Sequence, residues 1–211
     1  IGFGFGGDER RLNITSPGEK GVQADVVLKP RGASYDLSGS LRWPLALADV
    51  AKTAENTPLI SGDVVVQGEF KSTGRGPAAA AAALEGKGNY WLSNAKFSRL
   101  TLDGFGTAAL NATTPAALTS ALAQLDSGAG TAIGQRIGNF TVLNGQVVVS
   151  PIPVKAESVD AVIAPQFDFA SGVLRVATAI GLTARPDLPQ VTITYEGPRG
   201  ALATRNGTSA L

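Results

Sequence analysis

The chain has 211 residues, of which 44% are hydrophobic and 17% charged, and its net charge is +1. This composition excludes a disordered chain, and the scattered Lys and Arg residues offer no basic stripe for nucleic acid. Since the sequence contains no Cys and no His, it also excludes thiolate chemistry, imidazole acid–base catalysis and ordinary zinc sites, and we expect neither a metal nor a cofactor.

The chain begins at Ile1 without an initiator Met or a signal peptide, and we expect it to be a piece of a longer protein. Residues 1–21 start with a Gly-rich segment and are expected to form a lead-in or an edge strand. Residues 22–211 are expected to form a single β-rich domain. No apolar run approaches the ~20 residues of a membrane-spanning helix, so any membrane anchor is expected outside this sequence.

The first half of the domain alternates apolar and polar residues, which is typical of half-buried strands. This pattern predicts strands over residues 22–28, 35–43 and 64–70. Pro44 is expected to end the second strand, and a short helix is expected over residues 45–51. An Ala-rich helix is predicted over residues 78–84, with Pro77 in its first turn.

Further along, a strand is predicted to include Tyr90 and Leu92, and another to cover residues 97–102. The best helical pattern lies between residues 106 and 128, where Thr114 is a suitable N-cap and Pro115 a suitable first residue. Residues 140–143 and 146–149 then read as a hairpin, because Asn144-Gly145 suits a two-residue type I′ turn.

Alternation continues to residue 195, with successive strands about 8–12 residues apart, which indicates an antiparallel meander. One face of such a sheet should be dry and the other wet. The predicted helices are too few to cover the dry face. Either the sheet curls on itself, or part of its dry face is left for something else. We therefore expect a mainly β fold with a few short helices packed at one side or end.

Catalytic constellations are hard to find. The carboxylates of Asp8-Glu9, Asp160 and Asp168 lie among solvated strand or turn positions. Ser93 could act as a nucleophile only with a lysine as its base, such as Lys87 or Lys96, and no motif supports that pairing. We therefore expect a protein that is not an enzyme.

Tyr90 and Trp91 are adjacent, so on a strand their side chains point to opposite faces of the sheet. One reading is ordinary core packing at both positions. The other is that Tyr90, Trp91 and Phe97 form a sugar-stacking patch or a lipid contact, and the sequence leaves both readings open.

The segment of residues 72–103 has a recognisable order of elements. A strand ends in Thr73-Gly74-Arg75, the Ala-rich helix follows, and Glu85-Gly86-Lys87-Gly88 leads into residues 90–102. This order resembles the signature segment of the C-terminal region of the AsmA family, and the similarity extends over residues 37–211. The match is weaker where the family has Asp-Gly in a hairpin, because Asn94-Ala95 stands there instead.

The resemblance implies a bacterial cell-envelope protein that lies in the periplasm and is tethered to the inner membrane by a segment outside this chain. The resemblance also implies a curled antiparallel sheet, resembling a half-barrel or a taco, with an apolar inner groove. AsmA-like proteins are associated with outer-membrane assembly and with phospholipid transport between membranes, and they have no catalytic residues. The implied partners are a phospholipid or another acyl lipid and other segments of the same chain, and no nucleic acid.

The leading hypothesis is thus a lipid-transport module with an apolar groove, and the alternatives are a structural or adhesion module and a carbohydrate-binding module. The candidate groove residues are apolar strand residues on the predicted dry face. They are Val64, Val66, Phe70, Val147, Val149, Leu174, Val176 and Ile180.

Overall fold

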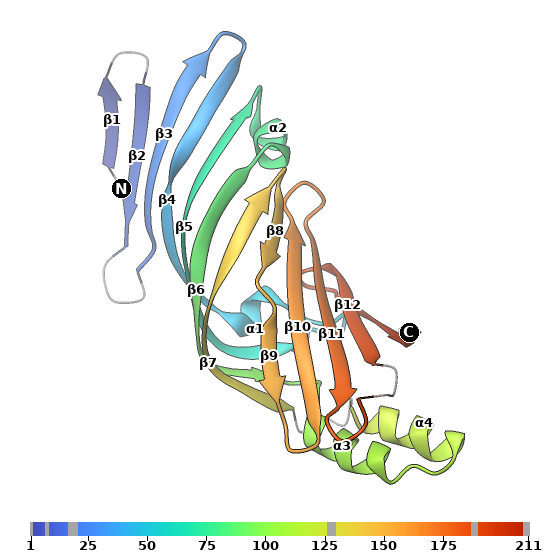
Figure 1. The fold of residues 1–211 in the computed structure, drawn as a ribbon. Helices are drawn as coiled ribbons and strands as arrows, with labels where there is room; N and C mark the ends of the chain where they lie inside the picture. Colours follow the sequence, from blue (N-terminus) through green and yellow to red (C-terminus); the bar gives the residue numbers. More distant parts are fainter. Residues whose placement is uncertain (1, 7–8, 17–20, 126–129, 187–189, 209–211) are drawn as a thin grey trace.

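A computed structural model describes residues 2–6, 9–16, 21–125, 130–186 and 190–208 of the chain. Its strands form one 13-stranded sheet in which every ladder between strands is antiparallel (Figure 1). Twelve strands follow one another from β1 to β13, and β9 lies beside β10 off this path. The strands are β1 Gly2–Gly6, β2 Glu9–Thr15, β3 Gln23–Arg31, β4 Ser34–Ala46, β5 Ile60–Gly74, β6 Glu85–Phe97, β7 Thr131–Leu143, β8 Gln146–Val149, β9 Ile152–Lys155, β10 Val159–Asp168, β11 Val173–Leu182, β12 Val191–Pro198 and β13 Ala203–Thr208.

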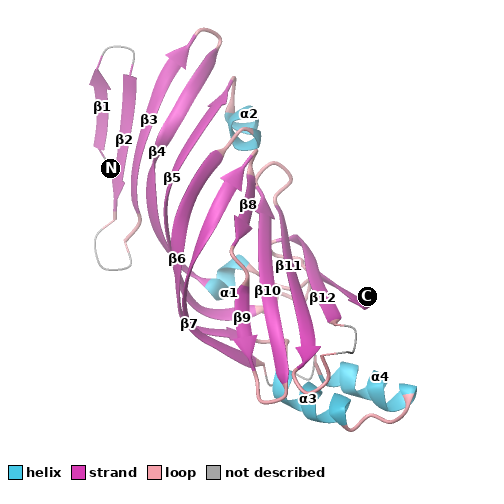
Figure 2. Ribbon diagram, in the orientation of Figure 1, coloured by secondary structure: helices cyan, strands magenta, loops and turns pink. Residues whose placement is uncertain are grey.

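The helices of the described residues are few and short (Figure 2). Helices α3 (Leu102–Leu110) and α4 (Pro115–Gln124) pack against each other at one end of the sheet. Helix α2 (Pro77–Ala82) lies against β5 near the opposite end, and α1 (Leu47–Val50) contacts β4 and β5. Most of the sheet therefore has no helix against it, and the fold is a mainly β antiparallel meander, as the alternation predicts.

The first residues of the chain continue the same sheet. Strand β2 pairs with β3, and the Gly-rich strand β1 pairs with β2 and forms an edge. Strand β13 forms the other end of the strand order, so the sheet is open. The strands at the two ends of this order do not pair into a closed barrel, and the predicted curl of the sheet stays a prediction.

Two local predictions are confirmed by the backbone. Asn144 and Gly145 have φ angles of 51° and 76° between β7 and β8, as a type I′ hairpin turn requires. The Thr114 hydroxyl accepts a hydrogen bond of 3.2 Å from the Ala117 amide, which caps α4 ahead of Pro115.

Two other predictions are wrong. Strand β4 does not end at Pro44 but runs on to Ala46. The ladder between β3 and β4 ends at Arg42, so Pro44 lies beyond it and interrupts no pairing with β3. Residues 97–102 are not a strand: β6 ends at Phe97, and Leu102 begins α3. Leu102 and Phe105 are both buried at helical spacing in α3, and this contact with the core overrides the strand reading.

The segment that resembles an AsmA hairpin also differs from its expectation. Strand β6 passes through Asn94 without turning back, and its register against both neighbours shifts there. Asn94 has a φ angle of 52°, which an asparagine tolerates better than most residues. The Asn94-Ala95 pair therefore forms a bulge inside one long strand.

The core lies at the end of the sheet that carries α3 and α4. There, strands that are not neighbours in the sheet contact one another: the rings of Phe97 on β6 and Tyr195 on β12 have centroids 5.7 Å apart. The amide of Lys52 donates to the carbonyl of Arg199, and the amide of Leu202 donates to the carbonyl of Lys52, both at 2.9 Å. The connection between β4 and β5 is thereby joined to the turn between β12 and β13.

Thr178 on β11 is an anomaly in this core. Its side chain is fully buried, and its hydroxyl has no hydrogen-bond partner among the residues that the structure describes. Since an unpaired buried hydroxyl costs about 1–3 kcal/mol, we expect Thr178→Val to raise the free energy of unfolding by about 1 kcal/mol in urea titrations. The matched variant Thr192→Val, on the neighbouring strand β12, should change it by less than about 0.5 kcal/mol. A loss of stability in Thr178→Val would contradict this account.

Candidate functional site: an apolar hollow

The main candidate site is an apolar hollow of about 480 Å³ on the dry face of the sheet. Its volume falls within the ~300–1,000 Å³ that is typical of small-molecule pockets. Strands β4 to β11 and helix α1 all contribute to its wall. The lining residues are Leu41, Trp43, Leu45, Leu47, Val50, Ala51, Leu59, Ile60, Val64, Val66, Gly68, Glu69, Phe70, Leu84, Tyr90, Leu92, Phe97, Ile133, Phe140, Val142, Val147, Val149, Ile152, Ile163, Pro165, Phe169, Leu174 and Val176.

Strand register explains why these side chains meet. Phe70 pairs with Gly86, which pairs with Val142 on β7, and Val142 pairs with Val147 on β8. The row continues through Phe167 to Leu174 on β11. Because paired residues of neighbouring strands point to the same face, the row forms a continuous apolar stripe across the sheet.

The wall is almost free of charge. Glu69 is the charged residue among the lining residues, and its neighbours Gly68 and Phe70 belong to the dry face. Side chains alternate along a strand, so the Glu69 carboxylate points to the other face and only its main chain borders the hollow. An apolar molecule in the hollow would therefore meet hydrocarbon and aromatic groups.

Aromatic rings and glycines interlock on this wall. A Cβ atom on Gly88 would lie 2.6 Å from Cζ of Phe140, and one on Gly138 would lie 2.5 Å from Cζ of Tyr90. Both distances are too short for a real contact, so each ring occupies the space that a side chain on the neighbouring strand would fill. Both rings also line the hollow.

Seven of the eight groove residues that the sequence predicts line this hollow, namely Val64, Val66, Phe70, Val147, Val149, Leu174 and Val176. Ile180, the eighth, is 1% exposed and belongs to the packed core, outside the hollow.

Several lining residues were not among the predicted ones, including Leu41, Trp43 and Phe140. Their alternation within predicted strands marks them as dry-face residues. Their place beside the hollow follows from the pairing of Trp43 with Val66 and of Phe140 with Val149. The sequence signal for them is the alternation itself. It places these residues on the dry face of strands that contain a predicted groove residue or pair with such a strand.

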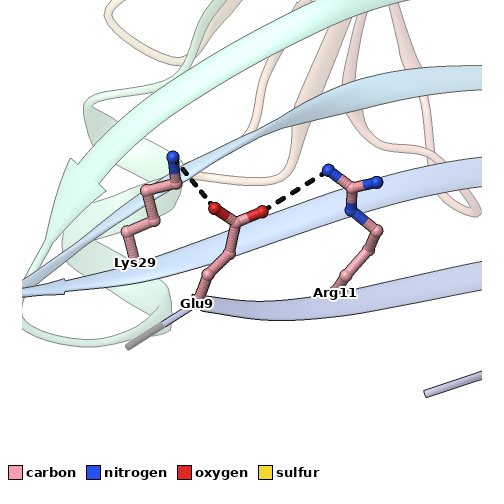
Figure 3. A network of polar contacts seen from close by, with 3 residues as sticks. All are labelled: Glu9, Arg11 and Lys29. Atoms are coloured by element: carbon pink, nitrogen blue, oxygen red, sulfur yellow. Dashed lines mark hydrogen bonds and ion pairs between the residues drawn. The ribbon is translucent and has the colours of Figure 1, made fainter. Parts of the chain in front are cut away.

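Glu9, one of the carboxylates considered for catalysis, belongs to a surface ion-pair network. Glu9 lies between two cations, 3.0 Å from Lys29 Nζ and 3.4 Å from Arg11 Nη2 (Figure 3). The hydrogen bond from Lys29 is the main cause that lowers the pKa of the Glu9 carboxyl below its usual value. A carboxylate kept ionised in this way suits a surface ion pair better than a proton donor. Asp8 lies outside the described residues.

Asp168 holds the turn between β10 and β11. Its carboxylate accepts hydrogen bonds from the amides of Ala170 (2.8 Å) and Ser171 (2.9 Å), and the Ser171 amide is the main cause that lowers its pKa. Asp160 is exposed near the start of β10, opposite Lys155 on β9 and Gly181 on β11. Neither carboxylate borders the hollow.

A Ser–Lys pair does not form from Ser93 and Lys87. The two residues lie six positions apart on strand β6, which corresponds to roughly 20 Å at about 3.3 Å per residue. Lys96 follows the bulge and pairs with Ser61 and Ala132.

Within the described part of the chain, no group of three or more acidic residues is placed to hold a metal ion. The helices described here are also not long and apolar enough to cross a bilayer. Comparisons with protein-family models, with curated proteins and with solved structures found no match for this chain.

Proposed function

We propose that this chain is a non-catalytic lipid-binding module, which shelters phospholipid acyl chains in the apolar hollow. The observation that carries this proposal is the continuous hydrocarbon wall, to which strands β4 to β11 contribute and which no charged side chain enters. The candidate acid, base and nucleophile residues that the structure describes lie apart from the hollow, and this arrangement supports a binding role.

The energetics suit exchange with a membrane. Each methylene group that leaves water contributes about 0.8 kcal/mol, so ten buried methylenes would contribute about 8 kcal/mol. A bilayer offers nearly the same gain for each methylene. Transfer of an acyl chain between a bilayer and the hollow would then cost little, and the wall would not select among headgroups.

The resemblance to the AsmA family supplies the proposed setting. In this setting the chain is a periplasmic module of an AsmA-like protein that is tethered to the inner membrane, and it takes part in outer-membrane assembly and phospholipid transport. The sheet would curl around the hollow in a half-barrel or taco-like shape. The backbone hydrogen bonds between Lys52 and the β12–β13 turn support such a curl, because they bring together distant parts of the sheet.

The first experiment is to purify the chain from bacteria and to measure bound lipid by native mass spectrometry and solvent extraction. We expect phospholipid at close to one molecule per protein, since the hollow is apolar and of ligand size. A folded monomer that carries no lipid and takes up none from vesicles would contradict the proposal and favour a packed structural module.

A second measurement tests whether bound lipid lies in the hollow. The chain has two tryptophans, and Trp43 lines the hollow whereas Trp91 does not. In the variant Trp91→Phe, phospholipid with brominated acyl chains should quench the fluorescence of Trp43. In the variant Trp43→Phe, the same lipid should leave the fluorescence of Trp91 unchanged. Equal quenching of both would place the lipid elsewhere.

A further inference from the structure

The wet face of the sheet carries ordered rows of polar side chains. Thr15, Gln23, Arg42 and Gln67 are paired in register on β2 to β5, and the row continues through Asn89 and Asn139. A second row, parallel to the first, is formed by Asn13, Asp25, Ser40, Glu69, Lys87 and Thr141. Because neighbouring strands lie about 4.8 Å apart, each row repeats a polar group at a step close to the length of one sugar unit.

These rows line a broad depression of about 1150 Å³, which we call the polar depression. Its charged lining residues are Asp25, Glu69, Arg42 and Lys87, so the two negative and two positive groups balance. Such a surface has no net field to attract a polyanion such as nucleic acid. The charge balance favours an uncharged ligand.

Five carboxamides line the polar depression, and they are Asn13, Gln23, Gln67, Asn89 and Asn139. None of these side chains hydrogen-bonds another residue that the structure describes. A carboxamide both donates and accepts hydrogen bonds. A row of such groups therefore matches the hydroxyl groups of a polyol, which also do both.

Trp91 adds an apolar platform at the edge of these rows. It is half-buried and pairs with Val65 on one side and with Ile137 on the other, and Ile137 is 74% exposed. Asn89 precedes Trp91 by two residues on the same face, and Gln67 and Asn139 lie diagonally across the ladders. Diagonal neighbours are about 7–8 Å apart, so one sugar ring could stack on the indole and reach these amides.

We infer that the polar depression binds a neutral glycan chain, with Trp91 as the stacking platform and with Gln67, Asn89 and Asn139 as hydrogen-bonding groups. This site lies on the opposite face of the sheet from the apolar hollow. Its existence does not depend on lipid binding. The chain would thus hold two chemically different ligands, one on each face.

The test is calorimetry with four neutral hexasaccharides, namely cellohexaose, maltohexaose, xylohexaose and chitohexaose. We expect at least one of them to bind with a Kd below about 1 mM. In the variant Trp43→Phe the same sugar should shift the emission of Trp91, whereas Trp91→Phe protein should show no such shift. If none of the four sugars shows saturable binding, the inference is overturned.

Variants decide whether the bound sugar lies in the polar depression. Gln67 and Asn139 are exposed, so the double variant Gln67→Ala, Asn139→Ala should fold normally and weaken binding about tenfold. Gln135→Ala, which is exposed on the same strand β7 but outside the depression, should bind like the parent. Circular dichroism verifies the fold of each variant. Undiminished binding in the double variant would also overturn the inference.

Discussion

Replacing Phe97 by alanine is expected to lower the free energy of unfolding by about 3–5 kcal/mol, the range for large aromatic residues in well-packed cores. The Phe97 side chain is 1% exposed, and its ring lies 5.7 Å from that of Tyr195, which is 2% exposed. The change would leave a cavity where β6 meets β12. The measurement is equilibrium unfolding in urea, followed by the fluorescence of the two tryptophans.

Phe169→Ala is the matched control for that variant. Phe169 is 45% exposed and packs edge-on against Phe167 with centroids 5.1 Å apart. Truncating a half-exposed ring removes less buried area, so we expect a loss of no more than about 1 kcal/mol. Similar losses in the two variants would contradict the view that Phe97 is more tightly packed in the core than Phe169.

Introducing a carboxylate at Val147 is expected to reduce bound lipid at least tenfold. Val147 is half-buried on β8 and its side chain lines the hollow. An acyl chain in the hollow would have to cover the new charge, and burying an unpaired carboxylate costs several kcal/mol, where each 1.4 kcal/mol corresponds to a factor of ten. Bound phospholipid in Val147→Asp protein is measured by extraction and by quenching of Trp43.

The neighbouring residue provides the control for this experiment. Val148 is 45% exposed and, because of strand alternation, points away from the hollow. Val148→Asp should therefore keep the lipid content of the parent protein. Equal loss of lipid in both variants would indicate a general disturbance of β8 and would remove the support for this hollow as the binding site.

The sequence was most informative where apolar and polar residues alternate without interruption, as in the first six residues of β12. It was less informative where glycines take dry-face positions, as Gly86 and Gly88 do in β6. There the apolar cover comes from neighbouring strands, since the ring of Phe140 fills the space beside Gly88. A pattern read along one strand cannot show such a contribution from another.

The candidate site shows the same limit. Alternation shows which face a residue occupies, and this is why seven of the eight predicted residues line the hollow. Alternation does not show at which residue along a strand the hollow ends. Ile180 and Val176 lie on one face of β11, yet Val176 borders the hollow whereas Ile180 is packed in the core opposite Ala161.

The strand order also has a consequence for the way the protein folds. Most ladders join strands that are consecutive in the chain, so their hairpins can form locally and in order during synthesis. The contacts of Lys52 with the β12–β13 turn and of Phe97 with Tyr195 join residues far apart in sequence. These contacts must wait until the last strands have been made. A nascent chain that stops before β12 would therefore carry paired strands around an unfinished core, and its apolar surface would be available to chaperones at that stage.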